Sequence, residues 1–225
     1  TVGLISYLRT DSTRISEEAD AAARTYISEQ YGQNYVSQTE KTVKNGQKIQ
    51  DAHEAIRPTD SSLSPAMLKE QLPRDLFRLY QLIWTRFLAS RMAEAVYETT
   101  SVKIGAGDYR FNVAASKVKF DGFMTVYSYD SEKSTMNAAM KKITKDTEIT
   151  LSGLDPQQHF TQPPAHFTEA SLVKTLEELG IGRPSTYAPT ITTLLARRYI
   201  VKESKNLYIT ELGEAVNDMM EDGFP

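Results

Sequence analysis

The chain has 225 residues, 26 basic and 29 acidic, so its net charge of −3 excludes a histone-like polycation but leaves room for a local basic face. Its 40% hydrophobic and 24% charged residues exclude a disordered chain. It contains no cysteine, which excludes disulfides, a cysteine nucleophile and a thiolate zinc site, and fits a reducing compartment. No apolar run is long enough to span a membrane, and the chain starts as if inside a strand, so we expect a piece of a longer protein.

The first third of the sequence predicts a helical domain. Residues 2–8 are apolar with polar interruptions and predict a short strand. Ser16, followed by two glutamates, predicts the start of a helix that ends at Gly32. Residues 33–64 predict loop and short strand, and Pro65 marks a second helix start. A long helix is expected from about 73 to 93, because apolar residues recur there at helical spacing.

The middle of the chain changes to period two. Residues 96–104 and 109–113 alternate apolar and polar side chains around a glycine-rich turn, which predicts a hairpin. The segments 117–127 and 147–152 predict further strands, and 130–146 shows no clear pattern.

The last part opens after Pro163 and Pro164. Helices are expected from Thr168 to Gly180 and from Ser185 to Arg198, then strands over 199–203 and 207–210 around a Lys-Asn turn, then a helix from Glu211. The whole order, helical, then β, then helical, predicts a mixed α+β protein in three parts.

The order helix, turn, helix and two-stranded wing in 161–225 is typical of a winged helix-turn-helix. Residues 181–205 contain five basic residues and one glutamate, a local charge of +4 in an acidic chain. Threonine hydroxyls and helix N-termini in the same stretch suit phosphate contacts. Composition alone leaves an ordinary solvated helix face as an equal alternative.

Tyr7 stands two residues before Arg9, and such positions share a face in a strand. A tyrosine that attacks a phosphodiester needs a nearby cation, because a phenol is mostly protonated at neutral pH and the transition state gains negative charge. From this spacing alone, a tyrosine on a half-buried strand beside a surface arginine is the commoner explanation.

Residues 53–59 (His-Glu-Ala-Ile-Arg-Pro-Thr) group an imidazole, a carboxylate and a guanidinium near a proline, which suits a phosphate cradle. The alternative is an exposed loop with a structural ion pair. A zinc-protease site is excluded, because the position four residues after His53 is Arg57 instead of a second histidine. Gly105 and Gly107 fit a hairpin turn and not a nucleotide-binding loop.

Five motifs, taken together and in order, closely resemble the core of bacterial DNA topoisomerase I, a type IA enzyme. The resemblance covers nearly the whole chain and is weakest across 128–147. The motifs are 6–12 (Ser-Tyr-Leu-Arg-Thr-Asp-Ser), 53–59, 79–84 (Leu-Tyr-Gln-Leu-Ile-Trp), 167–174 (Phe-Thr-Glu-Ala-Ser-Leu-Val-Lys) and 180–188 (Gly-Ile-Gly-Arg-Pro-Ser-Thr-Tyr-Ala).

This resemblance implies roles for particular residues. It makes Tyr7 the nucleophile that cuts one DNA strand and keeps the 5′ phosphate, and Arg9 the cation that stabilises this step. Further residues are implied to support the active site or to hold single-stranded DNA: Asp11, His53, Arg57, Arg183, Thr186 and Arg197. Glu54 and Thr59 are implied to matter less.

The resemblance also implies the rest of the enzyme. It predicts relaxation of negatively supercoiled DNA without ATP, in a monomeric, cytoplasmic protein that needs no membrane, with 1–93 as the catalytic-tyrosine domain, 94–160 as a β-rich arch and 161–225 as part of a winged-helix-like DNA gate. The family's Mg²⁺ site is an Asp-x-Asp-x-Glu motif in a Toprim domain, and this motif does not occur in the chain. We therefore expect the Mg²⁺ ligands to lie outside this chain, no metal site within it, and no cleavage by the chain alone.

Two other functions would explain part of the sequence. A non-catalytic winged-helix DNA-binding module explains 161–210 but leaves the clusters at Tyr7 and His53 as coincidences. A tyrosine recombinase also uses a phenol and arginines, but its tyrosine follows the other catalytic residues near the C-terminus, the reverse of the order here.

Overall fold

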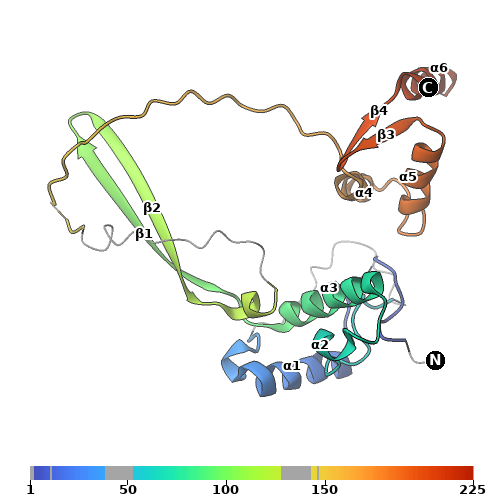
Figure 1. The fold of residues 1–225 in the computed structure, drawn as a ribbon, viewed down its shortest axis with the longest axis horizontal. Helices are drawn as coiled ribbons and strands as arrows, with labels where there is room; N and C mark the ends of the chain where they lie inside the picture. The colour runs from blue at the N-terminus through green and yellow to red at the C-terminus, as the bar shows by residue number, and fades with distance from the viewer. Residues whose placement is uncertain (1–2, 11, 39–52, 128–142, 146, 225) are drawn as a thin grey trace. The chain divides into compact units, whose positions relative to one another are not determined.

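A computed structural model describes residues 3–10, 12–38, 53–127, 143–145 and 147–224 (Figure 1). The chain separates into two compact units, residues 1–150 and 151–225. In the described residues no helix is long and apolar enough to cross a membrane. The three-part division stays a prediction, and Asp11 lies outside the described residues.

The first unit begins with a helical body. Helix α1 (Glu17–Tyr31) starts where the Ala19 amide donates to the Ser16 hydroxyl and ends at Gly32, whose φ of 105° needs a glycine. These ends confirm the predicted helix. A short 3₁₀ turn, η1 (Gln33–Tyr35), follows.

Two further helices supply the core of this unit. Helix α2 (Pro65–Leu68) has proline in its first turn, and helix α3 (Arg74–Arg91) runs over most of the predicted long helix. Two buried aromatic residues of α3 bond the loop before α2: the Trp84 indole donates to the Ser61 carbonyl at 3.0 Å, and the Tyr80 hydroxyl donates to the Leu63 carbonyl at 2.6 Å. Burial raises the pKa of Tyr80 to about 12. The core consists of Ala23, Ile27, Val36, Leu68, Tyr80, Trp84, Phe87, Leu88 and Met92.

An ion-pair network joins α1 to α3 at the edge of this core. Asp20 of α1 accepts hydrogen bonds from Arg24 in its own helix and from Arg91 in α3. Burial by itself would raise the pKa of Asp20, but the hydrogen bonds from the two arginines outweigh it and hold the pKa below its ordinary value.

A long hairpin rises from the helical body. Strands β1 (Val96–Ala106) and β2 (Tyr109–Phe120) pair antiparallel, with Val102 opposite Val113. The predicted hairpin is confirmed. The separate strand predicted over 117–127 is wrong, because β2 ends at Phe120 and the chain continues as a 3₁₀ turn, η2 (Gly122–Thr125).

Two other predicted strands are wrong. Residues 147–152 alternate in polarity but form no strand, since in the described residues β1 and β2 pair only with each other. In the segment predicted as strand 2–8, the described residues contribute a single bridge between Ile5 and Pro58.

The second unit has the predicted order of elements. Helix α4 (Glu169–Glu178) carries a capping box between Thr168 and Ser171, and a left-handed Gly180 follows it. Helix α5 (Tyr187–Ala196) starts two residues later than predicted. Strands β3 (Ile200–Glu203) and β4 (Asn206–Ile209) form the wing, turning at Ser204 and Lys205 instead of Lys-Asn, and helix α6 (Glu211–Gly223) ends the unit.

Candidate active site

Two distant segments of the sequence lie side by side in the first unit. The Ser6 amide donates to the Arg57 carbonyl at 2.8 Å, and the Thr59 amide donates to the Leu4 carbonyl at 3.1 Å. The Thr59 hydroxyl adds a bond to the Gly3 carbonyl at 2.8 Å. The motif at 6–12 and the motif at 53–59 therefore meet, although about 50 residues separate them.

Tyr7 leaves this pairing and is exposed to solvent. Its residue surface is 74% accessible, and its ring stacks on that of His53 with centroids 6.4 Å apart and planes 23° apart. The phenol is thus accessible to a large substrate while its ring has an aromatic support. Two residues that the sequence singled out separately lie in direct contact.

Arg9 lies beyond a tight turn. Its amide donates to the Tyr7 carbonyl at 3.0 Å, so residues 7–9 form a three-residue turn and not a strand. The prediction that Tyr7 and Arg9 share a strand face is therefore wrong, although they remain close along the chain. Arg9 is partly buried, whereas Tyr7 is exposed.

The guanidinium of Arg57 is held within the protein. Its Nη2 and Nε lie 2.9 and 3.1 Å from Glu54 Oε2, and its Nη1 donates to the Pro58 carbonyl at 3.2 Å. Nη2 also lies 3.5 Å from the Ser16 hydroxyl, the cap of α1. Arg57 therefore fastens the segment that carries His53 to the start of α1, and Glu54 is more important to this arrangement than its low rank in the sequence suggested.

In the second unit, two of the three residues predicted to contact DNA, Arg183 and Thr186, are hydrogen-bonded to each other. The Arg183 amide donates to the Thr186 hydroxyl at 2.9 Å, and that hydroxyl donates to the Arg183 carbonyl at 3.0 Å. This close turn suits a glycine at position 182, where φ is +79°. A side chain there would crowd the turn, since its Cβ would lie 3.1 Å from the Thr186 hydroxyl. The Arg183 side chain is exposed beside the first turn of α5.

Arg197 lies at the opposite end of the same helix. It caps the C-terminus of α5, so about 16 Å of helix separates it from Thr186. The basic stretch 181–205 is also less positive than its count implies, since Lys202 Nζ lies 2.7 Å from Glu169 Oε2 of α4. Arg183 and Arg197 are therefore two separate cationic points along one helix.

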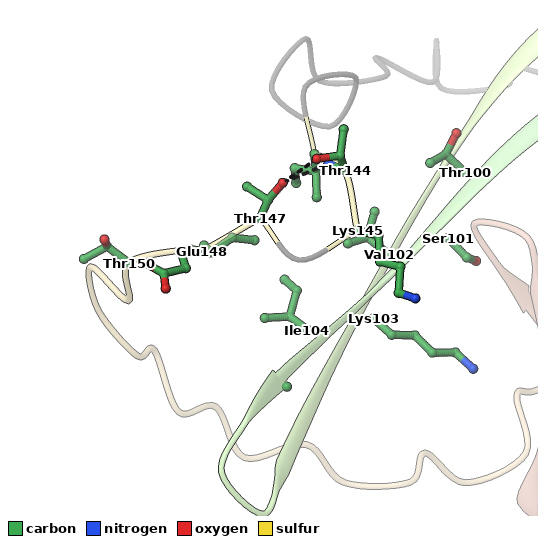
Figure 2. Close-up of a pocket in the computed structure, with 13 residues that line it drawn as sticks. Thr100, Ser101, Val102, Lys103, Ile104, Thr144, Lys145, Thr147, Glu148 and Thr150 are labelled. Carbon is green, nitrogen blue, oxygen red and sulfur yellow. Dashed lines mark hydrogen bonds between the residues drawn. The ribbon is translucent and has the colours of Figure 1, made fainter.

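A large hollow in the first unit contains none of the predicted site residues. An open cleft of about 840 Å³ runs along β1 between Thr100 and Gly105 and is lined on its other side by residues 143–145 and 147–150 (Figure 2). Its lining mixes threonine and lysine with isoleucine and valine side chains, and the hydroxyls of Thr144 and Thr147 are hydrogen-bonded at 2.9 Å. We assign the candidate chemistry to the exposed Tyr7 and not to this cleft, which has no nucleophile paired with a base or a cation cluster.

A metal site is not evident in the described part of the chain. No three acidic or histidine side chains gather there in a way that could hold an ion. The carboxylate of Glu54, in the described part of the site, forms an ion pair with Arg57 at 2.9 Å. The described residues therefore do not fit the magnesium expected for the family, and we derive no step through it.

Sequence reasoning missed the hydrogen bonds of Ser6, and it predicted Ser16 as a helix cap but not as a partner of Arg57. Each is a small hydroxyl whose partners are far away in sequence: Ser6 bonds residues 55 and 57, and Ser16 receives Arg57. Nothing local distinguishes a serine that will bond a remote backbone from a solvated one. Only the position of Ser6 directly before Tyr7 could have drawn attention to it.

Comparison with known proteins gives one consistent result. The family model for DNA topoisomerases matches residues 1–225. The structure of full-length topoisomerase I from Thermotoga maritima is similar, with a TM-score of 0.76 and 38% sequence identity. The match covers 98% of this chain and 35% of that chain, so this chain spans about a third of the length of the protein it matches.

Proposed function

The chain belongs to the family of bacterial type IA DNA topoisomerases, and from this premise we propose that Tyr7 is the nucleophile that cuts one DNA strand. The observation that carries the proposal is the exposed Tyr7 ring stacked on His53, in a segment fastened by Ser6 and Arg57. The Tyr7 side chain is exposed, whereas the backbone beside it is fixed by hydrogen bonds, so the phenol can reach a DNA strand from a defined position.

The proposed reaction is a transesterification. The Tyr7 phenol oxygen attacks a backbone phosphorus, a Tyr7–phosphate bond forms to the 5′ side, and the bond to the 3′ oxygen breaks. The phenol gives up its proton and the 3′ oxygen gains one. Attack by the freed 3′ hydroxyl reverses the step, so the number of phosphodiester bonds is conserved and no ATP is required.

Arg9 and His53 are proposed to assist at the phosphate. A guanidinium near the nucleophile neutralises charge that develops on the phosphate oxygens in the transition state. The imidazole of His53, beneath the Tyr7 ring, can donate a hydrogen bond to a neighbouring phosphate. Asp11 is proposed to orient its neighbours.

The rest of the proposal concerns DNA and the complete enzyme. Arg183, Thr186 and Arg197 are proposed to contact the backbone of a single-stranded segment, since arginine and hydroxyl groups are the usual phosphate ligands. Strand passage through the gap would relax negatively supercoiled DNA. The ligands of Mg²⁺ are proposed to lie outside this chain, and the enzyme is proposed to act as a cytoplasmic monomer.

The test is Tyr7→Phe in the enzyme that contains this chain. We expect no covalent adduct with an end-labelled single-stranded oligonucleotide and a DNA affinity within about twofold of the unmodified enzyme, since one hydroxyl is lost. Tyr109→Phe is the matched control, because Tyr109 is also 74% exposed and lies on the hairpin turn. An adduct that persists in Tyr7→Phe would refute the assignment.

The order helix, helix and wing in residues 168–209 also supports a second candidate, a DNA-binding module without catalysis. The same experiment separates the two. DNA binding without any adduct, in an enzyme with Tyr7 intact, would favour the module.

A further inference from the structure

We infer that Ser6 is a positioning residue for Tyr7: its hydroxyl ends the pairing with residues 57–59 and turns Tyr7 out to the solvent. The inference rests on the proposed role of Tyr7 and adds to it the group that places the phenol. The Ser6 hydroxyl makes its hydrogen bonds to the backbone of residues 55 and 57, so it would act through Tyr7 and His53 and not on the DNA.

At Ser6, the side-chain hydroxyl replaces the backbone carbonyl as the acceptor for the Arg57 amide. Ile5 faces Pro58 in an antiparallel bridge, which makes Ser6 and Arg57 the next pair. In a regular ladder this pair exchanges two bonds, one from each amide to the other carbonyl. The Ser6 amide does donate to the Arg57 carbonyl at 2.8 Å, but the Arg57 amide donates to the Ser6 hydroxyl at 2.9 Å instead of the Ser6 carbonyl.

The same hydroxyl also acts as a donor. It donates to the Ala55 carbonyl at 3.0 Å, so Ser6 uses both hydrogen-bonding capacities of its side chain on the segment that follows His53. Alanine can make neither bond, and a thiol makes both weakly. Serine and threonine are the side chains that suit this position.

After Ser6 the chain leaves the pairing with residues 57–59. Because the Arg57 amide donates to the Ser6 side chain, the Ser6 carbonyl does not accept from it, and only the Ser6 amide pairs with the backbone of Arg57. The next residues form the turn in which the Arg9 amide donates to the Tyr7 carbonyl. Tyr7 thereby becomes exposed instead of taking its place opposite Ile56. Because His53 lies two residues before Ala55, one hydroxyl fixes both rings of the stacked pair.

The test compares three variants in the enzyme that contains this chain. Ser6→Ala should let the Arg57 amide return to the Ser6 carbonyl, extend the ladder and move the phenol. Single-turnover cleavage of a saturating single-stranded oligonucleotide should fall roughly tenfold to a hundredfold, since a displacement of about 1 Å can reduce a rate that much. Ser6→Cys, nearly equal in size, should also be slow, and Ser6→Thr should cleave within about threefold of the unmodified enzyme.

The controls separate positioning from general damage. DNA affinity should stay within about twofold in all three variants, which a loss of folding would not allow. Ser90→Ala removes another partly buried hydroxyl, one that donates to the Phe87 carbonyl in the last turn of α3, and should leave cleavage unchanged. A readout besides activity is the NMR shift of the His53 ring protons with labelled histidine. These shifts should match the unmodified enzyme in Ser6→Thr and move toward those of Tyr7→Leu in Ser6→Ala.

The outcomes distinguish this inference from the proposed function. If Tyr7→Phe is inactive while Ser6→Ala and Ser6→Cys cleave at the unmodified rate, the positioning role is refuted and the nucleophile stands. If Tyr7→Phe still forms an adduct, the nucleophile is refuted whatever the Ser6 variants do. If Ser6→Ala does not fold, Ser6→Cys and Ser6→Thr decide, and equal rates in these two refute the inference.

Discussion

Arg9 carries the charge that we propose stabilises the transition state of cleavage. Arg9→Ala should slow cleavage by on the order of a hundredfold or more while it weakens DNA affinity much less, because a preorganised charge acts mainly on the transition state. Arg9→Lys should recover only part of the rate, since an ammonium lacks the planar fork of a guanidinium. Single-turnover cleavage and oligonucleotide affinity, measured on the same variants, test this.

Arg110→Ala provides the matched control for Arg9. Arg110 lies at the hairpin turn, where its guanidinium bonds the Gly107 and Tyr109 carbonyls at 3.0 Å. Its removal should leave cleavage unchanged. Equal cleavage by Arg9→Ala and Arg110→Ala would show that Arg9 has no special part in the reaction.

Gly213 lies where α6 meets the wing of the second unit, and it has no room for a side chain. A Cβ at this position would lie 2.0 Å from the Tyr199 carbonyl oxygen. Gly213→Ala should therefore lower the free energy of unfolding by about 1–3 kcal/mol or more, the usual cost of overpacking. Gly223→Ala is the control in the same helix, because a Cβ there meets nothing within 4 Å. Thermal or urea unfolding of both variants measures the difference, and equal stabilities would contradict the close packing.

At the scale of elements, the base of the hairpin is fastened to the helical body by Tyr35. The Tyr35 hydroxyl donates to Asp121 Oδ1 at 2.8 Å, and the Thr125 hydroxyl donates to Asp121 Oδ2 at 2.7 Å. These two hydrogen bonds hold the pKa of Asp121 below its ordinary value of 3.8, and the bond from Thr125 has the larger effect. Gly122, at φ +50°, lets the backbone approach Ala93 so closely that a Cβ would lie 2.5 Å from the Ala93 carbonyl oxygen.

A pH dependence of stability follows from this arrangement. A carboxyl with a depressed folded-state pKa stabilises the fold above its unfolded pKa, and that stability is lost as pH falls through the folded pKa. The difference in free energy of unfolding between the unmodified chain and Asp121→Asn should therefore be constant above about pH 5 and shrink below 3.8. Urea unfolding from pH 2.5 to 6 measures it, with Asp108→Asn at the hairpin turn as the control. A difference that grows on acidification would contradict the assignment.

The elements that could be predicted from sequence are those that local chemistry determines. Ser16 and Gly32 delimit α1, Thr168 caps α4, and period-two alternation around Gly107 makes the hairpin, all within a few residues. The errors depend on remote partners. Strand β2 stops at Phe120 because the next residues bond Tyr35 and Ala93, and the strand at 2–8 stops because the Ser6 hydroxyl takes the Arg57 amide.

At the scale of the whole molecule, the salt dependence of DNA binding should identify the phosphate contacts. Arg183→Ala and Arg197→Ala should each reduce the slope of log affinity against log salt by about 0.7 for single strands, because each releases one fewer counterion. Lys202→Ala should change the slope less, since Glu169 already offsets its charge. Titration of a fluorescent oligothymidine at several salt concentrations tests this, and a slope unchanged by both arginine variants would remove the case for a phosphate path along α5.

The assembly of the candidate site marks the limit of sequence reasoning at this scale. The local patterns identified Tyr7, His53 and Arg57 as reactive groups, but spacing alone gave no reason for residues 7 and 53 to touch, and it pointed to a shared strand face with Arg9 that the turn at Leu8 rules out. Only the resemblance of several motifs to one family linked them. Contacts between segments about 50 residues apart depend on the packing of α1 and α3 beneath them, which no local pattern encodes.

The short backbone between Ser6 and the phenol also has a mechanical meaning. In the proposed covalent state the cut DNA end is bonded to Tyr7. A force on that end acts on the neighbouring Ser6, which is held by three hydrogen bonds to residues 55 and 57. Arg57 in turn contacts the hydroxyl of Ser16, the cap of α1, and so links this segment to the helical body. In the proposed mechanism the cut end is therefore fixed to the helical body, and it would move only together with that body.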